Sequence, residues 1–106
     1  MNIDDIKAAG GFVSEQGEKR TIEWDGRSGE VFVRKASFGR IVTLQELPDA
    51  ERNMALVREC IRLGDNGDEA MSQDQVAALS PALAAAFMAA IAEVNALAAD
   101  ADSPNA

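Results

Sequence analysis

Two short runs in the N-terminal half of the chain alternate between apolar and polar residues. They cover residues 20–24 and 30–34, and the segment between them, residues 25–29, contains two glycines. Successive side chains of a strand point to opposite faces, so Ile22 and Trp24 share one face of the first run. The pattern predicts a β-hairpin whose strands are joined by residues 25–29.

Apolar residues after Pro48 recur instead at helical spacing. Cys60 lies at the edge of the apolar face, and Gly64 is a typical residue just beyond a helix end. The spacing predicts a helix over residues 50–63, followed by a polar turn over residues 64–68. The residues that share the apolar face of this helix are Ala50, Met54, Val57 and Ile61.

Capping residues mark two further helix starts. Ser72 and Gln75 have the spacing of a capping box, which predicts a short helix that ends near Leu79. Ser80 followed by Pro81 is typical of the start of another helix. In this last helix an apolar stripe repeats at helical spacing, and alanine fills most other positions. The stripe consists of Leu83, Phe87, Ile91, Val94 and Leu97.

Two segments near the hairpin complete the pattern. Asn2 can cap a short helix that ends near Ala9. Residues 38–44 are apolar enough to form either a third strand or an ordered loop. These elements predict an α+β fold, in which an N-terminal β-hairpin or small antiparallel sheet packs on a mainly helical C-terminal half.

The length of 106 residues is typical of one domain. We expect this domain to cover residues 1–98 and residues 99–106 to form a disordered tail, because the tail has little to bury. The domain is expected to have three parts in chain order: a short helix and loop over residues 1–19, the hairpin region over residues 20–47, and the helices over residues 48–98.

Charge is distributed unevenly along the chain. The net charge of -8 comes from 10 basic and 18 acidic residues, and no lysine or arginine follows Arg62. A strongly negative protein repels phosphate backbones, so we expect no nucleic acid as a partner. The surplus favours a protein partner with a basic face, or a homo-oligomer in which the acidic half of one copy meets a basic patch of another.

Several kinds of site are not expected in this sequence. One cysteine and no histidine exclude an internal disulfide and the usual zinc ligand sets. The acids around Gly67 suggest a calcium loop, but in that register the first ligand is Arg62 and the last is Gln73. With neither a glycine-rich phosphate loop nor a nucleophile elbow, the sequence predicts no metal, no cofactor and no enzyme.

The N-terminus and the hydropathy of the chain predict a cytoplasmic protein. Asp4 and Asp5 stand where a secretory signal has basic residues. The most apolar stretch, residues 81–99, is mostly alanine and includes Glu93, so no membrane association is expected.

Two features allow either a structural or a functional interpretation. Arg34 and Lys35, with Arg40 nearby, form a basic patch that is either a solvated strand edge or a contact for an acidic partner. Cys60 is expected to be a core residue rather than a reactive thiol, because it lies on the buried side of a helix and no histidine can activate it.

Several short motifs occur in a definite order. A Trp-Asp-Gly turn at Trp24 precedes Val-Phe-Val-Arg, a helix over residues 55–63 follows, and a Gly-Asp-Asn-Gly-Asp turn starts at Gly64. Ser-Pro then opens a final helix with Val94-Asn95 near its end. Over residues 20–98 this order resembles the tail assembly chaperones of long-tailed bacteriophages. The chain departs from that family after the Gly64 turn, where residues 69–71 offer only Met71 as an apolar strand residue.

The resemblance implies a non-enzymatic assembly factor that is absent from the mature virion. Such chaperones bind the tape measure protein, keep its hydrophobic helical segments soluble, and recruit subunits of the major tail tube protein. In many members a ribosomal frameshift adds a C-terminal domain, for which the segment from Ala98 onward is the corresponding place.

An alanine-rich helix in an acidic protein suits this role, because small side chains leave room for an amphipathic client helix. We therefore expect the client to contact the last helix, the helix that contains Met54, and the basic patch. The expected partner-binding residues are Met54, Phe87, Met88, Ile91, Val94, Leu97, Arg34 and Lys35.

Two other functions fit the same composition. One is a virion structural protein, such as a head-tail connector or a tail-completion protein. The other is a small acidic antitoxin-like regulator that neutralises a basic partner. Mass spectrometry of purified particles separates the first from a chaperone, and a tight complex with a toxin encoded beside it identifies the second.

Overall fold

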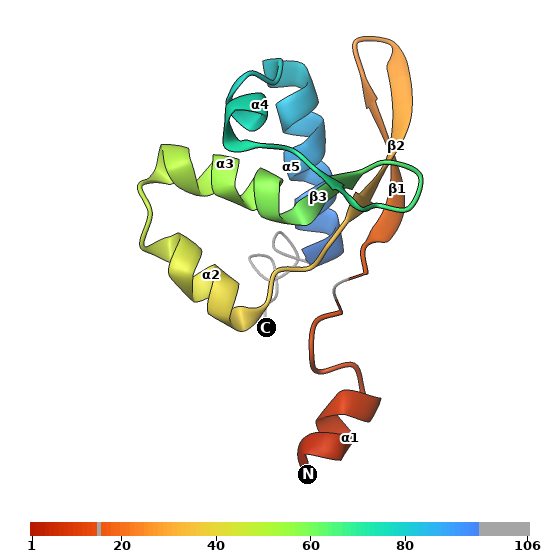
Figure 1. The fold of residues 1–106 in the computed structure, drawn as a ribbon, viewed down its shortest axis with the longest axis vertical. Helices are drawn as coiled ribbons and strands as arrows, with labels where there is room; N and C mark the ends of the chain where they lie inside the picture. Colours follow the sequence, from red (N-terminus) through yellow and green to blue (C-terminus); the bar gives the residue numbers. More distant parts are fainter. Residues whose placement is uncertain (15, 96–106) are drawn as a thin grey trace, which may run out of the picture.

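The computed structural model describes residues 1–14 and 16–95, and it confirms the α+β fold class. Figure 1 shows a sheet beside a group of helices, with one further helix set apart. The elements in chain order are α1 (Ile3–Ala8), β1 (Glu18–Trp24), β2 (Arg27–Val33), α2 (Phe38–Gln45), α3 (Asp49–Cys60), β3 (Ile61–Leu63), β4 (Glu69–Ala70), α4 (Gln73–Ala77) and α5 (Pro81–Asn95).

The predicted hairpin is present, but its turn is tighter than expected. Trp24 is paired with Arg27, so only Asp25 and Gly26 connect β1 to β2. Both have positive φ, 50° and 75°, which is the backbone of the two-residue turns that match the twist of a hairpin. The connection over residues 25–29 was therefore too long, and Ser28 and Gly29 belong to β2.

The helix predicted over residues 50–63 ends at Cys60, and Ile61–Leu63 is a strand instead. Ile61 pairs with Val33, and the backbone N–H of Arg34 donates to the Cys60 carbonyl at 2.7 Å. Ile61 is fully buried. The apolar pattern placed Ile61 correctly in the core but assigned it to the wrong element.

A second hairpin extends the sheet after β3. Leu63 pairs with Glu69, and Gly64 and Gly67 in the turn between them have φ of 86° and 71°. The predicted polar turn over residues 64–68 is thus confirmed, and the short strand β4 follows it. The sheet has the order β1-β2-β3-β4, so residues 48–98 are less purely helical than expected.

Residues 38–44 form neither a strand nor a loop, because they belong to α2. The side chain of Ser37 accepts a hydrogen bond from the Arg40 backbone N–H at 3.3 Å and caps the helix. Leu44 points inward and is buried, whereas Phe38 and Val42 are exposed.

The two C-terminal helices begin where capping chemistry predicted. Ser72 and Gln75 form the expected capping box, with hydrogen bonds of 2.8 and 3.2 Å. The Ser80 hydroxyl accepts from the Leu83 backbone N–H at 3.2 Å at the start of α5. Helix α4 ends at Ala77, slightly before the predicted Leu79.

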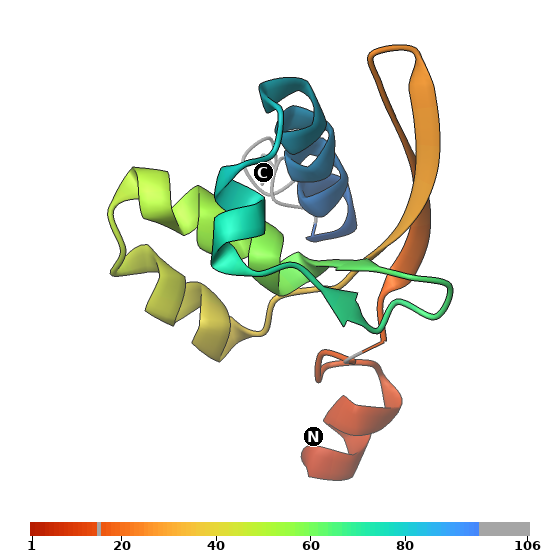
Figure 2. The same cartoon turned by 45° about the horizontal axis from the view of Figure 1, so that its top comes forward.

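The core lies between the sheet and helices α3, α4 and α5. Helix α5 packs on β1, β2 and α3, and α3 also packs on α4 (Figure 2). The most deeply buried side chains are Val33, Cys60, Ile61 and Ile91. Burial of such side chains against both layers is the main contribution to the stability of a domain of this size.

Helix α1 is separate from this body. The predicted cap is present, since the Asn2 side chain accepts from the Asp5 backbone N–H at 2.9 Å. No residue of α1 is buried, and Figure 1 shows the helix set apart from the sheet and from the other helices.

Among the described residues no helix has both the length and the apolar character needed to cross a membrane. The predicted disordered tail, residues 99–106, and the predicted contact residue Leu97 lie outside the described residues.

Candidate protein-binding site

Three of the predicted contact residues on α5 are part of the core. Phe87, Ile91 and Val94 are 3 %, 0 % and 6 % exposed, and they pack with Val33 and Ile61 in one cluster. In this fold these side chains are covered by the rest of the domain. Met88, on the flank of the helix, is partly buried against the same cluster.

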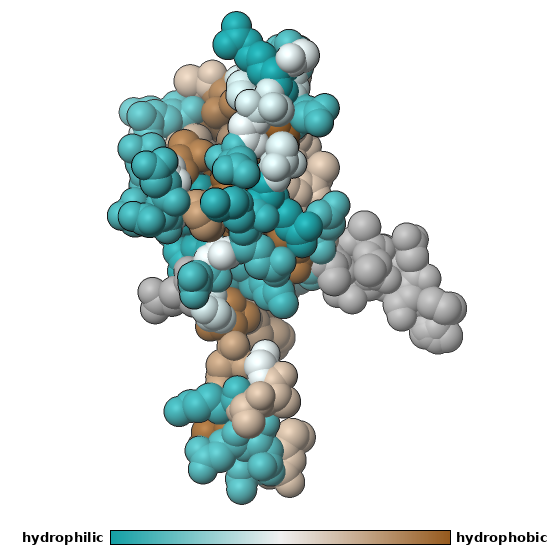
Figure 3. Space-filling view, turned by 90° about the vertical axis from the view of Figure 1, so that its right-hand side faces the viewer, coloured by the Kyte–Doolittle hydropathy of each residue, from teal (hydrophilic) through white to brown (hydrophobic). Residues whose placement is uncertain are grey.

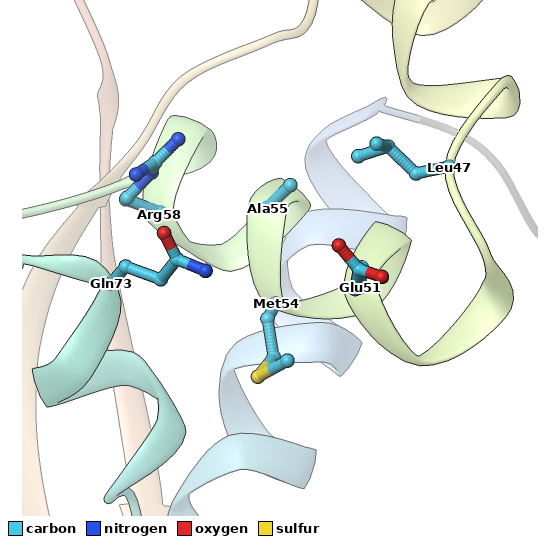
Figure 4. Close-up of a pocket in the computed structure, with 6 residues that line it drawn as sticks. All are labelled: Leu47, Glu51, Met54, Ala55, Arg58 and Gln73. Atoms are coloured by element: carbon cyan, nitrogen blue, oxygen red, sulfur yellow. The ribbon is translucent and has the colours of Figure 1, made fainter.

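The predicted contact residue Met54 borders a shallow hollow on α3. Figure 4 shows its side chain turned toward α5, while Glu51 and Arg58 bring charge to the hollow. Met54 is itself partly buried against the core. The hollow is lined by apolar and polar side chains in about equal measure. The lining residues are Leu47, Glu51, Met54, Ala55, Arg58 and Gln73.

Some alanines of α5 are partly buried, and others are exposed. Ala86 and Ala90 are partly buried and face a hollow beside β1, whereas Ala85 is exposed. An ion pair of 3.0 Å joins Arg20 of β1 to Glu93 of α5 across this hollow. The alanines therefore serve mainly to bring α5 close to the sheet, and they leave no large apolar surface on this side.

The predicted basic residues Arg34 and Lys35 lie in a different setting. They border two adjoining hollows between the chain segment after α1 and the segment that joins β2 to α2. The two hollows share Val13, Ser14 and Lys35. We call this surface the neck groove, and it consists of Phe12, Val13, Ser14, Arg34, Lys35 and Arg40.

The neck groove combines exposed apolar side chains with positive charge. Phe12 and Val13 are 56 % and 41 % exposed, and Figure 3 shows apolar colours along the narrow part of the molecule between α1 and the body. Lys35 is exposed beside them. Apolar residues next to free charge are common at protein-binding surfaces, where they provide both contact area and orientation.

Basic residues outnumber acidic ones in the lining of this groove, which includes Glu18 and Glu59 besides Arg34, Lys35 and Arg40. Residues 34–45 contain three basic residues and no acidic one, within a chain whose net charge is -8. Arg40 is paired with Glu59 of α3 at 3.2 Å. The buried Nε of Arg34 has no hydrogen-bond partner among the described residues. Lys35 is thus the charge most accessible to an incoming carboxylate.

Sequence reasoning found Arg34 and Lys35 but missed Phe12 and Val13. Their signal was present, because a phenylalanine and a valine stand together in a stretch rich in glycine and polar residues that predicts no strand or helix. Apolar residues in such a loop either pack on the body or stay available to a partner.

The thiol of Cys60 contributes no reactivity to this surface. Its side chain is fully buried, and burial, with the negative charge of Glu59, raises the pKa of the thiol from 9.0 to about 11. A thiol with a raised pKa is a poor nucleophile at neutral pH. The structure confirms the prediction that Cys60 is a core residue.

Comparison with known proteins assigns the chain to a family. A family model described as phage tail assembly chaperone matches residues 4–95. The chain belongs to the phage tail assembly chaperones. No curated protein and no solved structure matches it. The match begins at Asp4, so the family model covers most of α1 and the segment that follows it. The resemblance over residues 20–98 did not include these residues.

The structure also explains the Val94-Asn95 pair at the end of α5. Val94 is buried in the core, and the Asn95 side chain holds the segment between β2 and α2. Its Oδ1 accepts from the Ala36 backbone N–H at 2.8 Å, and its Nδ2 donates to the carbonyls of Ile91 and Arg34 at 2.9 and 3.4 Å. The motif thereby fixes the backbone that carries Arg34 and Lys35 in the neck groove.

Proposed function

We propose that this chain binds the tape measure protein of its phage during tail assembly, keeps it soluble, and recruits tail tube subunits to it. The family assignment supports a role in tail assembly. The observation that carries the client-binding part is the neck groove, where Phe12 and Val13 are exposed beside Lys35.

The groove suits an amphipathic helical segment that carries carboxylates beside its apolar face. The apolar face would cover Phe12 and Val13, and a carboxylate would pair with Lys35 at the rim. The negative charge over the rest of the chain opposes aggregation of the complex, because like-charged complexes repel one another. Met54 and Met88 remain proposed as additional contacts, each through the part of its side chain that is not covered.

The same proposal places the protein in the host cytoplasm, outside the mature virion, and gives it no enzymatic step. Binding and release of protein partners are sufficient for the task. The deep burial of Phe87, Ile91 and Val94 supports a client site formed by the neck rather than by the apolar stripe of α5.

Co-expression with the tape measure protein tests the proposal. A variant that combines Val13→Asp with Lys35→Glu puts negative charge where the two hollows of the groove meet, and both side chains are exposed enough to leave the fold intact. We expect wild-type protein to keep the tape measure protein in the soluble fraction and the variant to lose most of this effect. Binding should weaken by about tenfold or more, as for other changes at the centre of a contact surface.

The matched control combines Ala85→Asp with Arg27→Glu, which makes the same change of charge at exposed positions of α5 and the hairpin. This control should retain wild-type activity. Equal loss in both variants would show an effect of net charge alone, and no loss in the groove variant would refute the neck groove as the client site.

A further inference from the structure

Two parts of this protein have apolar surface that its own fold leaves uncovered. One is α1, where Ile3 is 68 % exposed and no residue is buried. The other is the outer face of α2, where Phe38 is 82 % and Val42 is 41 % exposed. With the half-buried Ile41, Phe38 and Val42 form what we call the α2 stripe. An exposed phenylalanine at the start of a helix adds nothing to the stability of an isolated chain.

Helix α1 is built to stand apart from the body. Its capping box between Asn2 and Asp5 satisfies the first turn locally, so the helix needs no tertiary contact to begin. Gly10 has φ of 77°, and a Cβ at Gly11 would overlap the side chain of Ile6. The chain therefore turns sharply after α1, and the helix lies apart from the body (Figure 1).

The chemistry of α1 and that of the α2 stripe are complementary. Ile3 and Ile6 are three residues apart and lie on one side of α1, and Asp4 and Asp5 outweigh Lys7, so that helix has a net negative charge. The segment of residues 34–45, which contains the α2 stripe, has three basic residues and no acidic one. The apolar pair of α1, which has acidic residues beside it, is thus complementary to the α2 stripe, which has basic residues nearby.

We propose that two copies of this chain exchange their N-terminal arms, so that α1 of each copy docks on the α2 stripe of the other. Ile3 and Ile6 cover Phe38 and Val42. The exchange is reciprocal, which gives a closed two-fold dimer rather than an open chain.

The reach of the arm permits this exchange. Residues 9–17 join α1 to β1, and nine extended residues span at most about 30 Å. The whole molecule measures 46 × 31 × 26 Å, so the arm can cross to a neighbour of the same size. The exchange uses Ile3 and Phe38, which lie outside the neck groove, and it does not depend on the proposed client.

Light scattering on the eluted full-length protein, measured over a dilution series, tests the exchange. The wild-type protein should show twice the mass of one 11.2 kDa chain. Ile3→Glu and Phe38→Glu should each give monomers. Ile3 and Phe38 are the first residues of their helices, where a glutamate favours the helix, so circular dichroism should show unchanged folding. Ala82→Glu, an exposed change in the first turn of α5, is the matched control and should dimerise.

Mixing the two monomeric variants provides the decisive measurement. The intact arm of the Phe38→Glu chain can dock on the intact α2 stripe of the Ile3→Glu chain, which restores one of the two contacts. The mixture should form a one-to-one heterodimer of intermediate affinity. Wild-type protein that stays monomeric throughout the series, variants that dimerise like wild type, or a mixture without heterodimers would each overturn the exchange.

Discussion

At the scale of single residues, Cys60 shows how burial changes the pKa of a side chain in this domain. Its side chain is fully enclosed, and its pKa is raised from 9.0 to about 11 chiefly because burial disfavours the thiolate. The protonated thiol is therefore favoured in the folded state. Stability from this source is complete below pH 9.0 and is lost as the pH rises toward about 11.

Replacing Cys60 with alanine should remove this pH dependence. The wild-type free energy of unfolding should fall between pH 9.0 and pH 11, by up to about 1.4 kcal/mol per pH unit, from the thiol alone. Cys60→Ala should be less stable at all pH values because of the cavity, but its slope should be smaller. Denaturant unfolding at several pH values measures both slopes, and identical slopes would show that the thiol ionises equally well in the folded state.

Local capping chemistry could be predicted from the sequence at this scale. Asn2, Ser72 and Ser80 cap helices as expected, because each acts on backbone groups only two or three residues away. Ser37 was missed as a cap because the residues after it, Phe38 and Gly39, suggested a strand or loop more than a helix.

At the scale of elements, the sequence could not separate helix from strand at residues 61–63. Ile61 fits the apolar face of α3 and is also buried in β3, so its apolar character allowed either element. The deciding factor is the free edge of β2, which offers hydrogen bonds at Phe32 and Val33. That edge is present only in the folded chain, so the periodicity of a single segment does not reveal it.

Two glycines in turns provide a test of how the second hairpin packs. Gly26 and Gly67 have similar φ, 75° and 71°, so alanine should cost about 1–2 kcal/mol of strain at either position. A Cβ at Gly67 would lie 2.6 Å from the Phe32 ring, whereas nothing lies within 4 Å of one at Gly26. Gly67→Ala should therefore lower the free energy of unfolding by about 1–3 kcal/mol more than Gly26→Ala. Equal losses in denaturant unfolding would show that the turn does not pack on Phe32.

At the scale of the whole molecule, the fold class could be predicted but the proposed binding surface could not. Phe87, Ile91 and Val94 of the apolar stripe of α5 were predicted as partner-binding residues, and in the structure they are part of the core. The neck groove joins Phe12 and Val13 to Lys35, which is more than twenty residues away in the chain. Only the packing of β2 beside the neck brings these residues together, so no local pattern indicates the groove.

The central claim is the proposal that this protein acts on the growing tail and leaves before the particle is complete. Basic residues predominate in the neck groove, whereas the rest of the surface is acidic. This difference in charge supports transient contact with a client. A virion subunit such as a connector would remain bound instead.

Quantitative mass spectrometry of infected-cell lysate and of purified particles from the same culture tests this claim most directly. The account predicts peptides of this chain in the lysate and none in the particles, in which the tape measure and tail tube proteins serve as internal standards. Peptides of this chain in the particles at a fixed ratio to the tail proteins would contradict it and would identify a structural component of the virion.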